Sequence, residues 1–197
     1  MPNVSAVKAK YFEPDGADND QVSATGSATT LVIADGGPYG NLTETITLTS
    51  SANNSGITFD ITGTDGNGDA QTETLTGPNT TTVNSANKYA TVTSIVASGP
   101  ITTQIQAGIL GTGALTGIVF AGRTRIRGIT GTSKASAGSI VFKNTSITGT
   151  SLLTIPLTGA VSSIDPYIPD NGVLFDAGAY VNLTAASVTG VTVYYDG

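Results

Sequence analysis

The segment Ile61–Asn79 reads ITGTDGNGDAQTETLTGPN and decides the class of this chain. Threonine alternates with other residues on both sides of Asp65–Asp69, DGNGD, and Gly77-Pro78 closes the segment. An alternation of period two is typical of a half-buried strand, and a run of Gly, Asp and Asn is typical of a tight connection. The segment therefore predicts a β-hairpin.

The same alternation continues on the N-terminal side of this hairpin. Ile57–Thr62 places Ile57, Phe59 and Ile61 on one face of a strand, and Leu42–Thr49 does the same with Leu42, Ile46 and Leu48, Glu44 being the exception. No stretch of more than ten residues has the periodicity of a helix. We therefore expect an all-β fold with two β-sandwich-like or jelly-roll-like modules and an extended N-terminal arm.

The composition supports a folded, non-catalytic chain. Of 197 residues, 39% are hydrophobic and only 11% are charged, and 33 are threonine, which favours sheet. Cysteine and histidine are absent, which excludes disulfides, thiolate nucleophiles and the commonest general base. Carboxylates such as Glu44 and Glu73 could flank a sugar bond, as in glycosidases, but their spacing does not distinguish them from surface strand residues. We expect no enzyme.

Charge divides the chain into segments. Residues 1–30 include the acidic run EPDGADND and are expected to form the arm. Residues 1–122 carry a net charge of −7 and residues 123–197 a net charge of +1. This change, together with the loop before Ala121-Gly122, predicts an arm over 1–30, one β-sandwich-like domain over 31–122 and a second over 123–197.

The remaining sequence signals concern location. No run of 18 apolar residues is present, and the N-terminus MPNVSAVKAKYFEPDG lacks the apolar core of a signal peptide. We therefore expect no membrane partner and synthesis in a cytoplasm. The net charge of −6 makes nucleic-acid binding an unfavourable hypothesis.

Asp65, Asn67 and Asp69 form the densest cluster of candidate ligand oxygens. Oxygen side chains at alternate positions are typical of calcium loops, although the helices and the glutamate at position 12 of an EF-hand are missing. The alternative is an Asx-rich turn in which these side chains bond their own backbone. No cofactor is expected, with calcium kept as the minority hypothesis.

Arg123, Arg125 and Arg127 alternate along a predicted strand and form a basic stripe on one face. One interpretation is a solvated edge that prevents aggregation. The other is an interface with acidic residues of a neighbouring subunit, including the acidic N-terminal half of a second copy of this chain.

The segment from Ile61 to Gly99 resembles small virion structural proteins of tailed bacteriophages, particularly marine and cyanobacterial ones. In those chains I-T-G-T-D-x-x-G-x-x-x-T-E-T is followed by G-P, an aromatic residue and a V-T-S-I strand. The matching positions here are Ile61 to Asp65, Gly68, Thr72 to Thr74, Gly77, Pro78, Tyr89 and Val92 to Ile95. The C-terminal stretches Ile168–Phe175, Ala179–Leu183 and Val191–Tyr195 are similar to endings of phage proteins, so the resemblance covers roughly half of the chain.

This resemblance implies a virion protein made in the host cytoplasm. The preferred hypothesis is a capsid decoration (cement) protein that bridges capsomers. Such a protein would bind the major capsid protein or other virion proteins and would form a homo-oligomer, with a trimer favoured. A tail, adaptor or fibre-base protein is the alternative within the virion. A carbohydrate-binding module is the alternative from another class, and it predicts exposed aromatic residues on one sheet face.

Overall fold

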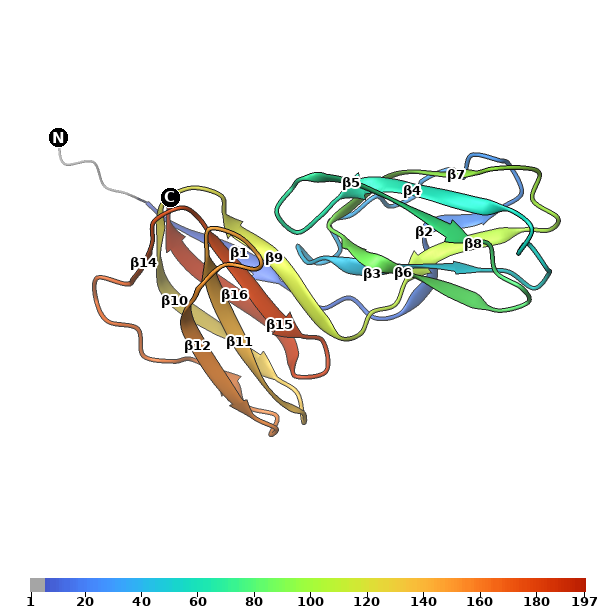
Figure 1. Ribbon diagram of the computed structural model, residues 1–197. Coiled ribbons are helices and arrows are strands. Elements are labelled where there is room, and N and C mark those ends of the chain that lie inside the picture. Colours follow the sequence, from blue (N-terminus) through green and yellow to red (C-terminus); the bar gives the residue numbers. More distant parts are fainter. Residues whose placement is uncertain (1–5) are drawn as a thin grey trace. The chain divides into compact units, whose positions relative to one another are not determined.

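A computed structural model describes residues 6–197, and strands form its regular structure (Figure 1). The described chain separates into two compact units, each of which is described by itself. The terminal unit comprises residues 6–14, Gly40–Leu42 and Thr112–Gly197, and the central unit comprises Asp15–Tyr39 and Thr43–Gly111. The described residues include no helix that could cross a bilayer.

The central unit is a sandwich of two sheets. One has the order β2-β8-β3-β6 and the other the order β5-β4-β7. The strands are β2 (Asp18–Gly26), β3 (Glu44–Thr49), β4 (Thr58–Thr64), β5 (Ala70–Thr76), β6 (Thr82–Tyr89), β7 (Thr91–Ala97) and β8 (Ile105–Ile109). Side chains from both sheets, such as Ile46 and Leu48 of β3 with Phe59 and Ile61 of β4, form one buried core. This is the sandwich arrangement in which alternate residues of each strand face inward.

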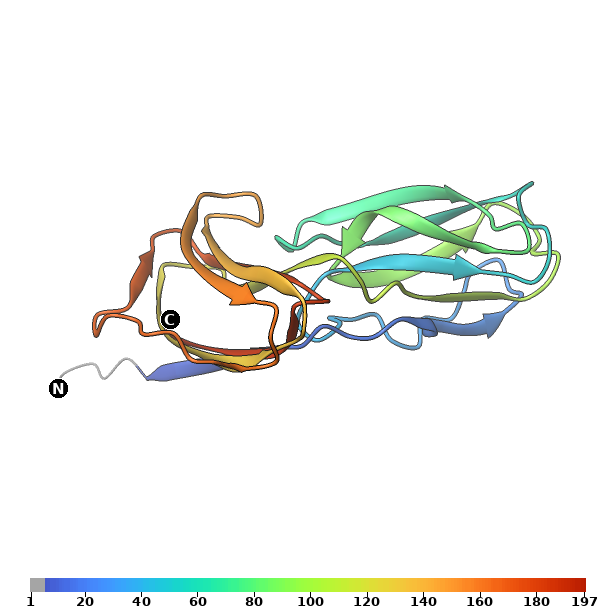
Figure 2. The ribbon, with the colours of Figure 1, turned by 90° about the horizontal axis from the view of Figure 1, so that it is seen from below.

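The terminal unit is a second sandwich of two sheets (Figure 2). One sheet has the order β1-β16-β10-β13, with β14 also paired to β10, and the other has the order β12-β11-β15-β9. The strands are β1 (Val7–Phe12), β9 (Ala114–Phe120), β10 (Thr124–Ser133), β11 (Ala137–Asn144), β12 (Ser151–Thr158), β13 (Ser163–Ile164), β14 (Val173–Phe175), β15 (Ala179–Thr184) and β16 (Val188–Asp196). Residues such as Ile126 and Val193 of one sheet and Phe142 and Val181 of the other share its core.

The predicted all-β sandwich class is confirmed, and the opening segment is a hairpin. β4 and β5 pair antiparallel from Thr58 opposite Thr76 to Thr64 opposite Ala70, and β7 pairs with the other edge of β4. Phe59 and Ile61 are fully buried while Asp60 between them is exposed, as the alternation predicts.

The compact units differ from the segments expected from charge. Of the expected arm, β1 pairs with β16 in the terminal unit and β2 pairs with β8 in the central unit, so the described part of residues 1–30 lies in two sheets. β9 precedes the expected boundary at Ala121-Gly122, yet it pairs with β15 of the terminal unit. Backbone pairing over long sequence distances sets the units, and the change in net charge does not mark their limits.

Candidate functional site

The predicted basic stripe lies on β10 and at its N-terminal end. Thr124 and Ile126 are buried, while Arg123 and Arg127 are exposed and Arg125 is half-buried, so the arginines point away from the core. Arg127 lies at a β-bulge between Ile126 and Gly128 in the pairing with β16, and it faces the same side as Asp196, with which it pairs. The alternation along this strand places all three guanidinium groups at the outer face of the sheet.

Each arginine of the stripe has a different partner. The Arg123 Nε lies 3.7 Å from the Asp176 carboxylate, and both side chains are about 70% exposed to solvent (69% and 71%). The Arg127 Nη1 lies 3.5 Å from the Asp196 carboxylate. Arg125 donates from Nη1 to the backbone carbonyl of Asn171 at 3.0 Å and forms no ion pair among residues 6–197. The charge of Arg125 is therefore held in place but is not balanced by a contacting carboxylate.

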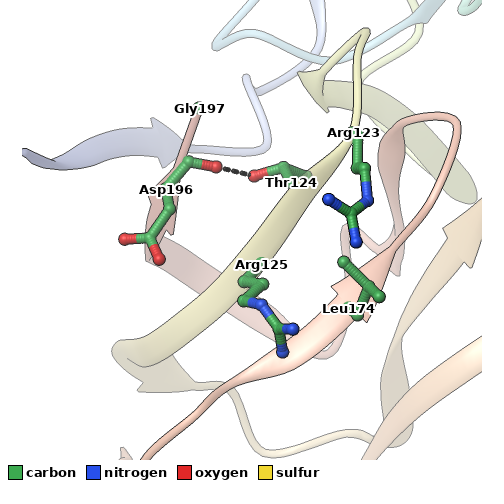
Figure 3. Close-up of a pocket in the computed structure, with 6 residues that line it drawn as sticks. All are labelled: Arg123, Thr124, Arg125, Leu174, Asp196 and Gly197. Atoms are coloured by element: carbon green, nitrogen blue, oxygen red, sulfur yellow. Dashed lines mark hydrogen bonds between the residues drawn. The ribbon is translucent and has the colours of Figure 1, made fainter. Parts of the chain in front are cut away.

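A shallow depression of about 240 Å³ opens between the two N-terminal arginines of the stripe. In Figure 3 the side chains of Arg123 and Arg125 extend from β10 toward Leu174, and the Thr124 hydroxyl donates to the Asp196 carbonyl. Asp196 also lines the depression, so two guanidinium groups lie there beside one aliphatic and one acidic residue. The planar fork of a guanidinium group matches the geometry of carboxylates and phosphates.

The sheet register places two tyrosines on the same outer face as the arginines. Val7, Asp196, Arg125 and Leu174 form one row across β1, β16, β10 and β14. Ala9, Tyr194 and Gly128 form the next row, and Tyr11, Thr192 and Thr130 the third. We call this surface the tyrosine–arginine face. Sequence reasoning found its arginines but not its tyrosines, because only the pairing of β1 with β16 joins them.

The two tyrosine rings lie against glycines of the neighbouring strands. The Tyr11 hydroxyl lies where a side chain of Gly190 would be, and the Tyr194 ring lies 3.4 Å from the position of a Cβ on Gly128. Tyr11 is 47% exposed and Tyr194 36% exposed. Tyr195, which points to the opposite face, packs against the core and stacks at a tilt with Phe120.

The candidate metal loop has the hydrogen bonds of an Asx turn. The Asp65 Oδ1 accepts from the backbone N–H groups of Asn67 and Asp69 at 2.8 and 2.9 Å, and its Oδ2 accepts from the Asn67 side chain at 3.1 Å. The turn closes with Asp65 N–H donating to the Asp69 carbonyl at 2.9 Å. These contacts engage both oxygens of Asp65, which favours the turn interpretation. Across residues 6–197, no three His, Cys, Asp or Glu side chains gather closely enough to hold a metal ion.

Two other carboxylates of the central unit are built into its structure. The Glu73 oxygens accept from the backbone N–H groups of Ala86 and Asn87 at 2.7 and 2.9 Å. Glu44 is fully buried, and its Oε1 has no hydrogen-bond partner among residues 6–197. Burial raises the pKa of Glu44 to about 7, against the opposing effects of the Gly111 N–H and the positive charge of Lys88. Glu73 thus links β5 to β6, and Glu44 lies in the buried interior of the unit.

Comparisons with known proteins give no family assignment. No protein-family model matches the chain, and no curated protein is significantly similar to it. Among solved structures, the chain aligns with the crystal structure of the major capsid protein P2 from bacteriophage PM2, over 96% of this chain and 97% of that chain. The sequence identity is 13% and the TM-score is 0.24. A TM-score this low does not establish a common fold.

Proposed function

We propose that this chain is a non-enzymatic structural protein of a tailed-phage virion, with a capsid decoration (cement) protein as its specific form. The observation that carries the proposal is where the phage-like motif lies in the fold. Residues 61–64 belong to β4, Asp65 begins the turn, residues 72–74 belong to β5, and residues 92–95 belong to β7, which pairs with β4. The motif thus contributes to all three strands of one sheet and to the turn between two of them, and its Tyr89 lies at the end of β6 in the facing sheet.

The motif's chemistry is structural. Asp65 caps its own turn, and Glu73 satisfies two backbone donors of β6. Gly63 sits where an added Cβ would lie 1.9 Å from the Thr91 carbonyl oxygen, so a close backbone approach requires glycine there. These motif residues hold the sheet together and have no arrangement that suggests catalysis. Their roles support a structural function in assembly.

The C-terminal part of the resemblance falls in the terminal unit. Val173–Phe175 is β14, Ala179–Leu183 lies in β15 and Val191–Tyr195 lies in β16. The resemblance therefore extends over both sandwiches. A protein with two separate sandwiches can contact two neighbours at once, which suits the bridging of capsomers.

The physical action of a cement protein is linkage. A protein that binds only the assembled shell lowers the free energy of that shell relative to its separated subunits. A protein that bridges capsomers needs exposed surfaces that bind its neighbours and needs no catalytic residues. The tyrosine–arginine face is one candidate for such a surface. The proposed partners are the major capsid protein or other virion proteins, and the proposed location is the virion.

Copy number and shell stability test this function. Particles lacking the chain should rupture at a lower temperature than complete particles, and adding the purified protein back should restore the rupture temperature. Gel densitometry of complete particles should give the chain in amounts comparable with the major capsid protein. About a dozen copies per particle, as for a six- or twelve-fold tail ring, would point to the tail alternative and reject the cement role.

A carbohydrate-binding module is the second candidate, because Tyr11 and Tyr194 expose ring surface on one sheet face. Aromatic faces of this kind stack on apolar faces of ligands. A glycan array with the wild type and the Tyr11→Ser, Tyr194→Ser double variant tests it. Binding by the wild type that is lost in the double variant would favour the module, and no binding by either would remove it.

A further inference from the structure

The two units carry opposite net charge. The central unit holds nine acidic residues and a single base, Lys88, for a net charge of −8. The terminal unit holds seven bases and five acids, for a net charge of +2. The contrast is larger than the one between the two halves of the sequence, because Lys8 and Lys10 of β1 belong to the basic unit.

The tyrosine–arginine face has the composition of a protein interface. Tyrosine and arginine are the residues most enriched at the energetic centres of interfaces. Val7 is exposed in the same row as Arg125, Tyr194 is exposed in the next row, and Tyr11 is exposed in the third. Because Arg125 is anchored by the Asn171 carbonyl, a carboxylate would meet a guanidinium group that is already positioned.

The central unit presents a matching pair of acids. Asp18 and Asp20 are exposed at the start of β2, which is the edge strand of its sheet. The Asp18 carboxylate accepts from the Asp20 N–H at 3.1 Å, and the proximity of Asp18 raises the pKa of Asp20. Two neighbouring carboxylates that repel each other are stabilised by a nearby cation.

We propose that the tyrosine–arginine face of one copy binds the acidic central unit of a second copy, with Asp18 and Asp20 opposite Arg123 and Arg125. The contact joins two different surfaces, so it is heterologous. Such contacts build closed rings when the rotation between copies closes, and the proposed trimer is one such ring. This inference rests on the proposed structural role and adds the partner and the residues of the contact.

Analytical ultracentrifugation of the full chain tests the contact. The wild type should associate at about 50 mM salt and dissociate substantially at about 500 mM, because screening weakens charge pairs between exposed groups. Arg125→Glu and, separately, Arg123→Glu should each weaken association at least about tenfold, equal to about 1.4 kcal/mol. Arg123 is largely exposed, so its variant tests the contact even where the Arg125 variant perturbs the segment at Asn171.

Charge exchange identifies the partner surface. The double variant Asp18→Lys, Asp20→Lys should also fail to associate, and combining it with Arg123→Glu and Arg125→Glu in one chain should restore association. Lys143→Glu on β11 and Asp69→Lys in the hairpin turn are the matched controls, and both should associate like the wild type.

Three results would overturn the contact between copies. One is a wild-type monomer at every salt and protein concentration, and another is association that the arginine variants leave unchanged. The third is loss of association in the aspartate and arginine variants without recovery in the combined chain, which assigns the arginines to a different acidic surface. Shell binding is measured separately on particles, so a monomer that still binds particles rejects this contact and keeps the cement role.

Discussion

The Glu44 carboxylate accepts a hydrogen bond from the Gly111 N–H, 3.3 Å away, while its second oxygen, in a fully buried site, has no partner in the described part of the chain. Glu44 faces the core from β3, in the same row of side chains as Ile46 and Leu48. The positive charge of Lys88 stabilises the ionised form of Glu44, and the negative charge of Asp15 destabilises it. Tyr39, also buried, has its pKa raised by burial and by the charges of Asp35 and Glu44.

The first prediction is a pH-dependent stability that Glu44 controls. Its pKa is about 7 in the folded protein and 4.5 ordinarily, so between these values the folded state keeps a proton that the unfolded state has released. The free energy of unfolding should therefore fall as pH rises from about 4.5 to about 7. Glu44→Gln stays uncharged and should melt at a higher temperature than the wild type at pH 8, with a smaller difference at pH 5. Asp69→Asn is the exposed control, and an equal shift in both variants would exclude Glu44 as the source.

The second prediction concerns the carboxylate that joins β5 to β6. Glu73→Ala leaves the N–H groups of Ala86 and Asn87 without their acceptors and should cost about 2 kcal/mol of unfolding free energy. Glu73→Gln keeps one acceptor and should cost about half as much. Thr76→Ala, on the exposed side of the same strand, is the control. Denaturant melts measure all three, and a loss below about 0.5 kcal/mol in Glu73→Ala would show that water replaces the carboxylate.

The third prediction separates the turn from the calcium hypothesis. If the DGNGD segment is a turn, Asp65→Ala should cost about 1–2 kcal/mol, because it removes three hydrogen bonds, whereas Asp69→Ala should be nearly neutral. A chelator should leave the melting temperature unchanged. A lower melting temperature with chelator, restored by calcium, would support the metal site instead.

The fourth prediction concerns the backbone contact within the motif. Gly63→Ala would bring a Cβ to 1.9 Å from the Thr91 carbonyl oxygen, which a paired strand cannot move aside, and should cost about 3 kcal/mol or more. A Cβ on Gly56 meets nothing within 4 Å, so Gly56→Ala is the matched control and should be nearly neutral. Comparable losses in both would mean that lost glycine flexibility, not steric overlap, dominates.

Strands with regular alternation could be predicted from the sequence. Phe59 and Ile61 are buried as expected, and β3 carries Ile46 and Leu48 inward. Leu42, which the same pattern grouped with them, belongs to the core of the terminal unit because the chain changes units between Leu42 and Thr43. Glu44 is a charged residue at a position that the alternation assigns to the apolar face. That position was the signal in the sequence for its burial.

Other elements gave no usable pattern. β6 reads TVNSANKY, in which polar residues dominate, and its bulge is held by Ser85 and Glu73 rather than by apolar packing. β9 begins with residues 114–117, where Gly and Thr signal a turn as readily as a strand. Residues 31–33 are apolar but belong to none of the strands of the described chain, and the preceding Thr30 makes an isolated bridge to Val96. The alternation of the three arginines could be predicted from the sequence. The presence of Tyr11 and Tyr194 on the same face could not, because it depends on pairing between strands at opposite ends of the chain.

The pairing of β1 with β16 sets an order of events during synthesis. Every residue of the central unit has left the ribosome once Gly111 emerges, so that sandwich can close while the chain is still growing. Val7 must wait for Asp196, its partner in the ladder, before the terminal sandwich can form. During that interval β1 is an unpaired strand that can pair with another nascent chain. Premature termination anywhere in the last strand would thus leave the acidic unit folded and the basic unit without its central pairing.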